Sequence, residues 1–353
     1  MLVSQKHKGF RCLPVTFAKA LLLPPTMAST PDILSLPFDA IHNILSSMPL
    51  PTLIRFRSTC RLADALAAEH IDHRIKTVLA GYFTDIQGLF AVLSSTSSVI
   101  SGSAAFAVCA PHNAFTPGDI DIYTPKGQSE RMVDYLVEKE GFEVVGTSRP
   151  FDKGVKYRGG IKLMVQLKRD EYHIDVVESL TRGASLPIAH FWTTTVMLFI
   201  TGTGICVLYP QLLERSRGLM TPVRVLDADG GADDFAHLVV KYKQRGVDIR
   251  TDERSWDNDD DPQPLCTSYY SPACGLTFRW VGDVYSLVTA FGTITDRTAT
   301  SAFTGLLETV TTVWWRGGRA CGPPCSAFTG MIRPNIYTQM RRRVEHAKIS
   351  QSE

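Results

Sequence analysis

Apolar residues recur at helical spacing through the first patterned stretch of the chain, residues 31–70. Ile41, Ile44 and Leu45 stand at positions i, i+3 and i+4, and the two prolines of the following "PLP" end this helix and begin the next. Two more short apolar faces follow. Three short helices bury too little surface to be stable alone. The pattern therefore predicts a small helical unit whose apolar face is left for a partner or a neighbouring part of the chain.

A second pattern, typical of a sheet covered by helices, begins near residue 94, after two amphipathic helices between residues 71 and 93. Following the loop "SSTSS", we expect a strand at "VISG", a helix at "SAAFAVCA", a strand at "DIDIYTP" and a helix from Ser129 to about Lys139. Two runs with period-two alternation come next, "GIKLMVQLKR" and "YHIDVVES", and they predict adjacent strands. This order indicates an α/β sheet with helices on its faces.

The signals weaken beyond residue 220. We expect an amphipathic helix at "DDFAHLVVKYKQRG", an acidic linker at "TDERSWDNDDDPQP" and an irregular, β-rich remainder. The predicted fold class is α+β. The predicted parts are a disordered extension over residues 1–30, a small helical domain over 31–72, a mixed-sheet α/β domain over 73–220 and the C-terminal region over 221–353.

Composition narrows the function classes only a little. The chain has 353 residues, 44% of them hydrophobic, which is enough for two or three domains with sizeable cores. Because 37 Lys and Arg balance 35 Asp and Glu, no overall charge indicates a nucleic-acid or membrane partner. Eight scattered cysteines and the lack of a secretory signal favour the cytoplasm or nucleus, without disulfides. The first 26 residues fit either a transit peptide or an unstructured extension upstream of a start at Met27.

A stretch without Asp, Glu, Lys or Arg runs over residues 183–213 and has to be tested as a membrane span. A spanning helix needs about 20 continuous apolar residues. Here proline, histidine, threonine and glycine residues interrupt the run. We therefore predict that "VMLFITGTGICVLYP" forms two buried strands around a glycine turn, and we expect no membrane association.

The helical stretch resembles the F-box. Leu36-Pro37 precedes an "I..IL" helix, and a Pro-Leu turn, an "L..FR" helix and a Cys-Arg pair follow in the order of that family. The resemblance implies that the apolar face binds a Skp-type adaptor, which links F-box proteins to a cullin ubiquitin ligase. The implied adaptor-binding residues are Leu36, Pro37, Ile41, Ile44, Leu45 and Leu53. Phe38-Asp39 replaces the commoner acidic residue after the proline, and packing of these helices on the rest of the chain is the alternative.

Two aspartates share one face of the predicted strand "DIDIY". Asp119 and Asp121 are two residues apart, so both project from the same side while the isoleucines between and after them enter the core. Like charges so placed repel, and a hard cation such as Mg²⁺ or Mn²⁺ would relieve the repulsion. Asp175 lies in the otherwise apolar strand "YHIDVVE". If the two strands are neighbours, the three carboxylates can converge on two metal ions about 3.5–4 Å apart.

Gly102 and Ser103 add a turn that could approach a ligand closely, with the amides of a helix start facing a triphosphate. Taken with Asp119, Asp121 and Asp175, the turn resembles the nucleotidyltransferase fold of poly(A) polymerases and DNA polymerase beta, over roughly residues 85–215. The resemblance implies that the aspartates hold two Mg²⁺ or Mn²⁺ ions, that Asp175 helps to activate the attacking hydroxyl, and that Gly102 and Ser103 bind the phosphates of an NTP. Residues 191–210 and "KYKQRG" also resemble fungal proteins that join an F-box-like start to such a domain.

Two hypotheses follow, and the sequence leaves the question of enzymatic activity open. In one, the chain transfers a nucleotidyl group from NTP to a hydroxyl by two-metal catalysis, with a nucleic acid as one possible acceptor. In the other, it is a non-catalytic, substrate-recruiting subunit of a cullin ubiquitin ligase whose second domain only binds. A zinc site is not favoured, because the spacing of the candidate ligands fits a turn with buried thiols equally well; they are Cys266, Cys274, Cys321 and Cys325.

Overall fold

The computed structural model describes residues 36–149, 159–221, 233–256, 272–275, 277–293 and 312–317. The chain divides into two units, residues 1–42 and 43–353. The expected extension over residues 1–30, three of the four candidate zinc cysteines and most of the acidic linker lie outside the described residues. Among the helices of the described ranges, none has the length and apolar character needed to cross a bilayer.

Four helices precede the sheet in the sequence. Two of the predicted helices, on either side of residue 70, are one continuous 19-residue helix, because no proline or glycine interrupts the segment and its apolar positions keep helical spacing. The expected loop at residues 94–98 begins later than predicted, since Ser95 and Thr96 donate side-chain hydrogen bonds to the carbonyl of Val92 and stay in the helix. The four are α1 (Phe38–Ser47), α2 (Leu50–Arg57), α3 (Arg61–Leu79) and α4 (Ile86–Thr96).

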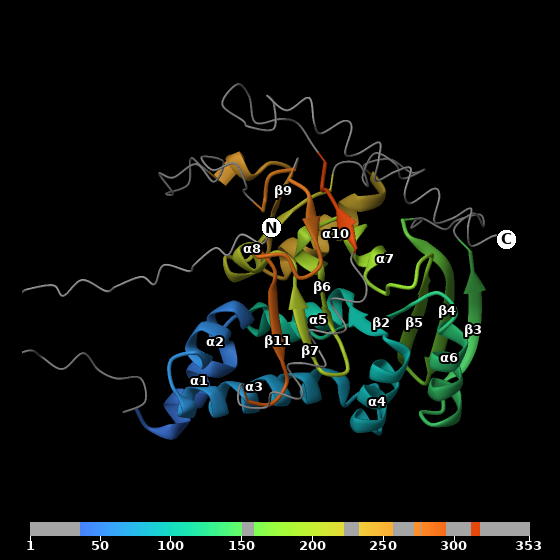
Figure 1. Ribbon diagram of the computed structural model, residues 1–353, viewed down its shortest axis with the longest axis horizontal. Helices are drawn as coiled ribbons and strands as arrows, with labels where there is room; N and C mark the ends of the chain where they lie inside the picture. Colours follow the sequence, from blue (N-terminus) through green and yellow to red (C-terminus); the bar gives the residue numbers. More distant parts are fainter. Residues whose placement is uncertain are drawn as a thin grey trace, which may run out of the picture. The chain divides into compact units, whose positions relative to one another are not determined.

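A mixed eight-stranded sheet forms the core of the second unit, in the order β11-β7-β6-β1-β2-β5-β4-β3 (Figure 1). The pair β2–β5 is parallel and the other neighbours are antiparallel. This combination of helices and a mixed sheet confirms the α+β class. The strands are β1 (Val99–Ser101), β2 (Ile120–Thr124), β3 (Glu143–Ser148), β4 (Ile161–Arg169), β5 (Tyr172–Ser179), β6 (Leu198–Ile200), β7 (Gly204–Val207) and β11 (Leu287–Ala290).

Most of these strands lie where the apolar pattern predicts them. The two strands around the glycine turn are β6 and β7, and all their residues are buried. The edge strand β3 was not predicted, because its valines, Val144 and Val145, are exposed and carry no alternation. The opposite edge strand, β11, comes from the C-terminal region and lies past the expected domain boundary at residue 220.

Helices cover the sheet. The helix α5 (Gly102–Cys109) is buried along its whole length and packs against β1, β2 and β6. The predicted helix after β2 is α6 (Ser129–Glu138), which packs on β5 and buries Met132 and Leu136. The remaining short elements are η2 (Pro111–Asn113), α7 (Leu186–Ala189), η3 (Thr194–Val196) and α8 (Pro210–Glu214).

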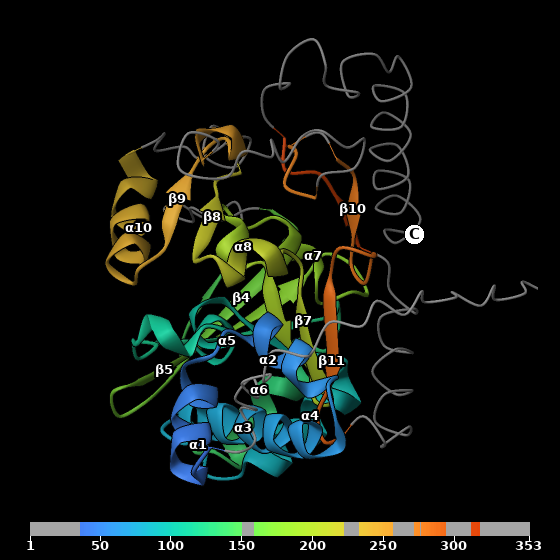
Figure 2. The ribbon, with the colours of Figure 1, turned by 90° about the vertical axis from the view of Figure 1, so that its left-hand side faces the viewer.

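The C-terminal helix α10 (Asp233–Gln244) forms as predicted, and it packs on β9 (Asp248–Arg250), which pairs in parallel with β8 (Arg217–Leu219) (Figure 2). A short 3-10 helix, η4 (Glu253–Trp256), follows where the acidic linker was expected to begin. A two-stranded ladder joins β10 (Arg279–Trp280) to β12 (Val313–Trp314). These elements give the region after residue 220 more regular structure than the sequence indicates.

Candidate functional site

The parallel pair β2–β5 brings two of the predicted aspartates side by side. Asp121 of β2 is in direct register with Asp175 of β5, so the two carboxyl groups leave the same face of the sheet. Their strand neighbours, Ile120, Ile122, Ile174 and Val176, are fully buried, whereas both aspartates are only partly buried. The alternation predicted for "DIDIY" is therefore present.

The third aspartate, Asp119, lies directly before β2 and on the same side as Asp121. The hydroxyl of Ser103 is 3.4 Å from its Oδ1 atom, at the first turn of α5. The charge of Asp119 is one of the causes that raise the pKa values of both Asp121 and Asp175. The three aspartates and Ser103 are thus brought together from β2, β5 and α5.

Gly102 allows the start of α5 to lie close to the carboxyl group of Asp121. It has a φ of +67°, a conformation that favours glycine, and a Cβ atom at this position would collide with the carboxyl group of Asp121. Ser101, the preceding residue, is the register partner of Asp121 on β1. The start of α5 therefore lies directly beside the carboxylates, and phosphate binding by Gly102 and Ser103 stays a prediction.

Burial and like charge both disfavour the ionised carboxylates of the site. Burial raises the pKa of Asp121 well above its usual value, and the charges of Asp119 and Asp175 raise it further. Burial also raises the pKa of Asp175, followed by the charge of Asp119, while a hydrogen bond from Gln166 on the adjacent strand β4 lowers it. The free energy cost of this arrangement would fall if one carboxylate bound a proton or if the carboxylates bound a cation.

The helix α10 adds groups that the sequence did not single out as site residues. Lys241 is exposed, and its positive charge lowers the pKa of Asp121. Tyr242 is buried, and burial is the main cause that raises its pKa. The charges of Asp121 and Asp119 raise the pKa further. Its ring meets that of Trp192 edge to face at 5.8 Å. The helical period placed these residues on α10, but no local pattern indicates which part of the sheet that helix reaches.

The carboxylates are the candidate ligand set for the predicted ions, and hard carboxylate oxygens suit Mg²⁺ or Mn²⁺. In the part of the chain that the structure describes, however, no three His, Cys, Asp or Glu side chains are arranged so that they could hold a metal ion together. The site therefore has the donor chemistry of a metal site without its assembled geometry. Two-ion binding stays a prediction.

The six predicted adaptor-binding residues divide into two groups. Leu36, Pro37 and Ile44 are exposed, with Ile44 at 39%. Ile41, Leu45 and Leu53 are buried. Two exposed apolar side chains that the predicted set omits are Phe38, at 62%, and Leu62, at 55%. Their exposure could have been suspected from their place at the start of a helix, where fewer neighbours cover a side chain.

Comparison with protein families matches residues 33–63 to the F-box domain. The match covers α1 and α2 and reaches the start of α3. Searches of the curated proteins and of the solved structures give no match. The chain therefore contains an F-box domain, which confirms the first resemblance, and the likeness to nucleotidyltransferases stays a prediction.

Proposed function

We propose that the chain recruits substrates to a cullin ubiquitin ligase, with its F-box domain bound to a Skp-type adaptor. The match at residues 33–63 carries this proposal. The exposed apolar side chains of the segment support it, because large apolar groups left in water are typical of residues that a partner covers; they are Leu36, Phe38, Ile44 and Leu62. The sheet-bearing part of the chain would then present the substrate.

The experiment is co-purification of the full chain with a Skp-type adaptor, comparing wild type with Ile44→Asp. Ile44 is exposed, so the variant is expected to fold, whereas a carboxylate in an apolar interface is left desolvated and unpaired. We expect at least a tenfold loss of adaptor affinity. Val144→Asp, an equivalent change at an exposed valine of β3, is the matched control and should bind as wild type. Equal binding by both variants, with unchanged Tm values, would contradict the proposal.

A second candidate function, nucleotidyl transfer, is favoured by one observation: the register of Asp121 with Asp175 beside the Gly102 turn. The acceptor oxygen would form a bond to the α-phosphorus of NTP, the bond to the β-phosphate oxygen would break, and pyrophosphate would leave. Asp175, whose pKa is raised, suits the uptake of the hydroxyl proton. Divalent ions at the carboxylates would supply charge neutralisation for the phosphates.

The test is incorporation of labelled nucleotide in the presence of Mg²⁺ or Mn²⁺, with NTP binding measured in parallel. Asp119→Ala is expected to reduce incorporation at least a hundredfold, because it removes one of the three carboxylates of the proposed ligand set. Asp134→Ala removes an exposed carboxylate on α6 and should leave the activity unchanged. If wild type binds NTP but does not incorporate it, a binding role is favoured. If wild type neither binds nor incorporates NTP, this second function is excluded.

A further inference from the structure

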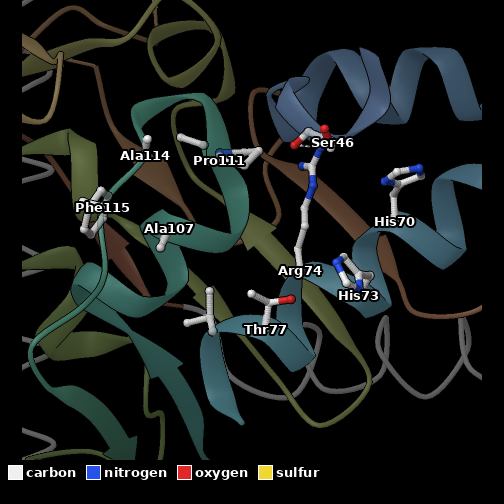
Figure 3. Close-up of a pocket in the computed structure, with 11 residues that line it drawn as sticks. Ser46, His70, His73, Arg74, Thr77, Ala107, Pro111, Ala114 and Phe115 are labelled. Carbon is white, nitrogen blue, oxygen red and sulfur yellow. Dashed lines mark hydrogen bonds between the residues drawn. The ribbon is translucent and has the colours of Figure 1, made fainter. Parts of the chain in front are cut away.

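A pocket of about 250 Å³ lies apart from the carboxylates, between α3 and the chain that runs from the second half of α5 to Phe115 (Figure 3). One wall is apolar and includes Ala107 and Phe115. The other wall carries donors from α3 and from the end of α1, namely Ser46, His70, His73, Arg74 and Thr77. Among the described residues, no aspartate or glutamate lines the pocket.

Arg74 runs along this polar wall and is only 6% exposed (Figure 3). Its Nη2 atom donates to the carbonyl oxygens of Leu45 and, at 2.7 Å, Met48, at the C-terminal end of α1. Its Nε and Nη1 atoms are closed to water and have no hydrogen-bond partner among the described residues. A buried donor without a partner costs free energy, and the cost is larger for a charged group.

Among the residues that the structure describes, the charge of Arg74 also lacks a counter-ion. Within the described ranges, no carboxylate comes within ion-pair distance of its guanidinium. Burial lowers the pKa of Arg74 to about 10, so the group is still charged at neutral pH. The charge of Arg74 also acts on His112 in η2. Burial is the main cause that lowers the pKa of His112, and the charge of Arg74 lowers it further. The backbone carbonyls of α1 supply partial negative charge on one side of the guanidinium only.

We propose that this pocket binds a small oxyanion, the phosphate or carboxylate group of a small molecule whose apolar body lies against Ala107 and Phe115. Arginine is the side chain best suited to such groups. The hydroxyl of Thr77 and the imidazole of His73, both exposed on the same wall, supply further donors. Binding requires a small movement of the Arg74 side chain that exposes its Nε or Nη1 atom to the pocket.

The experiment measures the Tm of the full chain against the concentration of inorganic phosphate or acetate, with sodium chloride holding the ionic strength constant. A ligand that binds only the folded state raises the Tm in a saturable way. We expect such a rise with at least one of the two anions. A response to phosphate alone identifies a phosphate ligand, and a response to acetate alone identifies a carboxylate ligand. Tm values equal to those in chloride alone would overturn the proposal.

The decisive variant is Thr77→Glu, because substitution of Arg74 itself would also remove its hydrogen bonds to the end of α1. Thr77 is exposed, lines the pocket and follows Arg74 by three residues on α3. The new carboxylate is expected to supply the missing charge, so that the Tm in chloride rises above that of the matched control Thr77→Gln and the response to added anion is lost. Thr77→Gln keeps a hydrogen-bond donor at this position in its side-chain NH2 group, so this variant should still respond to added anion. A Thr77→Glu chain that still responds like wild type would also overturn the proposal.

Discussion

At the scale of single residues, the carboxylate site works against the stability of the fold. Asp121 is held by the strand register beside Asp175 and by the turn at Gly102, and neither constraint lets the carboxyl groups separate. Its pKa is raised in the folded chain by burial and by its two aspartate neighbours. Like charges held together in this way are typical of functional sites.

This repulsion predicts that Asp121→Asn stabilises the chain at neutral pH. A carboxyl group whose pKa is raised by folding binds its proton more tightly in the folded state, so stability is lost as the pH rises through the folded pKa. Asparagine removes the charge, and we expect a gain of about 1–3 kcal/mol at pH 7, the usual cost of a buried polar group without a favourable partner.

The measurement is urea unfolding of wild type and Asp121→Asn at several pH values. Below about pH 4, where the carboxyl group is protonated in both states, the gain should disappear. Asp134→Asn, at an exposed position of α6, is the control and should be neutral throughout. A gain that persists unchanged at low pH would mean that the substitution acts through packing and not through charge.

At the scale of secondary-structure elements, a buried arginine joins the helices α2 and α3 to the sheet. Arg57, the last residue of α2, pairs with Asp64 of α3 at 2.7 Å. The same guanidinium donates to the hydroxyl of Thr289 at 3.2 Å and to the carbonyl oxygen of Ala290 at 3.0 Å, both in β11. Hydrogen bonds from a charged, buried group are among the stronger ones in proteins. The helices α2 and α3 and the edge strand β11 are therefore parts of one folded unit.

At the scale of the whole chain, the sequence predicts what depends on local pattern and misses what depends on distant pairing. The period of the apolar residues placed α5, α6, β4 and β5 correctly, and the like-charge pair of "DIDIY" led to Asp175, which the register then placed beside Asp121. The pattern could not reveal that β11 completes the sheet, or that Lys241 of α10 lies near enough to Asp121 for its charge to lower the pKa of that group. Both depend on contacts between residues far apart in the sequence, for which no local signal exists.

The placement of β11 predicts that residues 1–221 do not form a stable domain, although they contain the F-box and all three aspartates. Truncation there removes the strand that pairs with β7 at four positions, and it takes from Arg57 its partners in β11. Each lost hydrogen bond of a buried charged donor costs about 1.5–3 kcal/mol, although Arg57 keeps its pair with Asp64. Together with the exposed edge of β7, this should lower the Tm by at least about 5 °C or cause aggregation.

Thermal unfolding and size-exclusion chromatography of the truncated chain provide the measurement. The control is Val284→Asp in the full chain, a change at an 88% exposed position three residues before β11, which should leave the Tm within about 2 °C of wild type. A monomeric 1–221 chain with the Tm of wild type would show that β11 contributes little to the fold. In that case the F-box and the carboxylate site would form an independent domain, and the adaptor and nucleotide experiments could both be repeated on it.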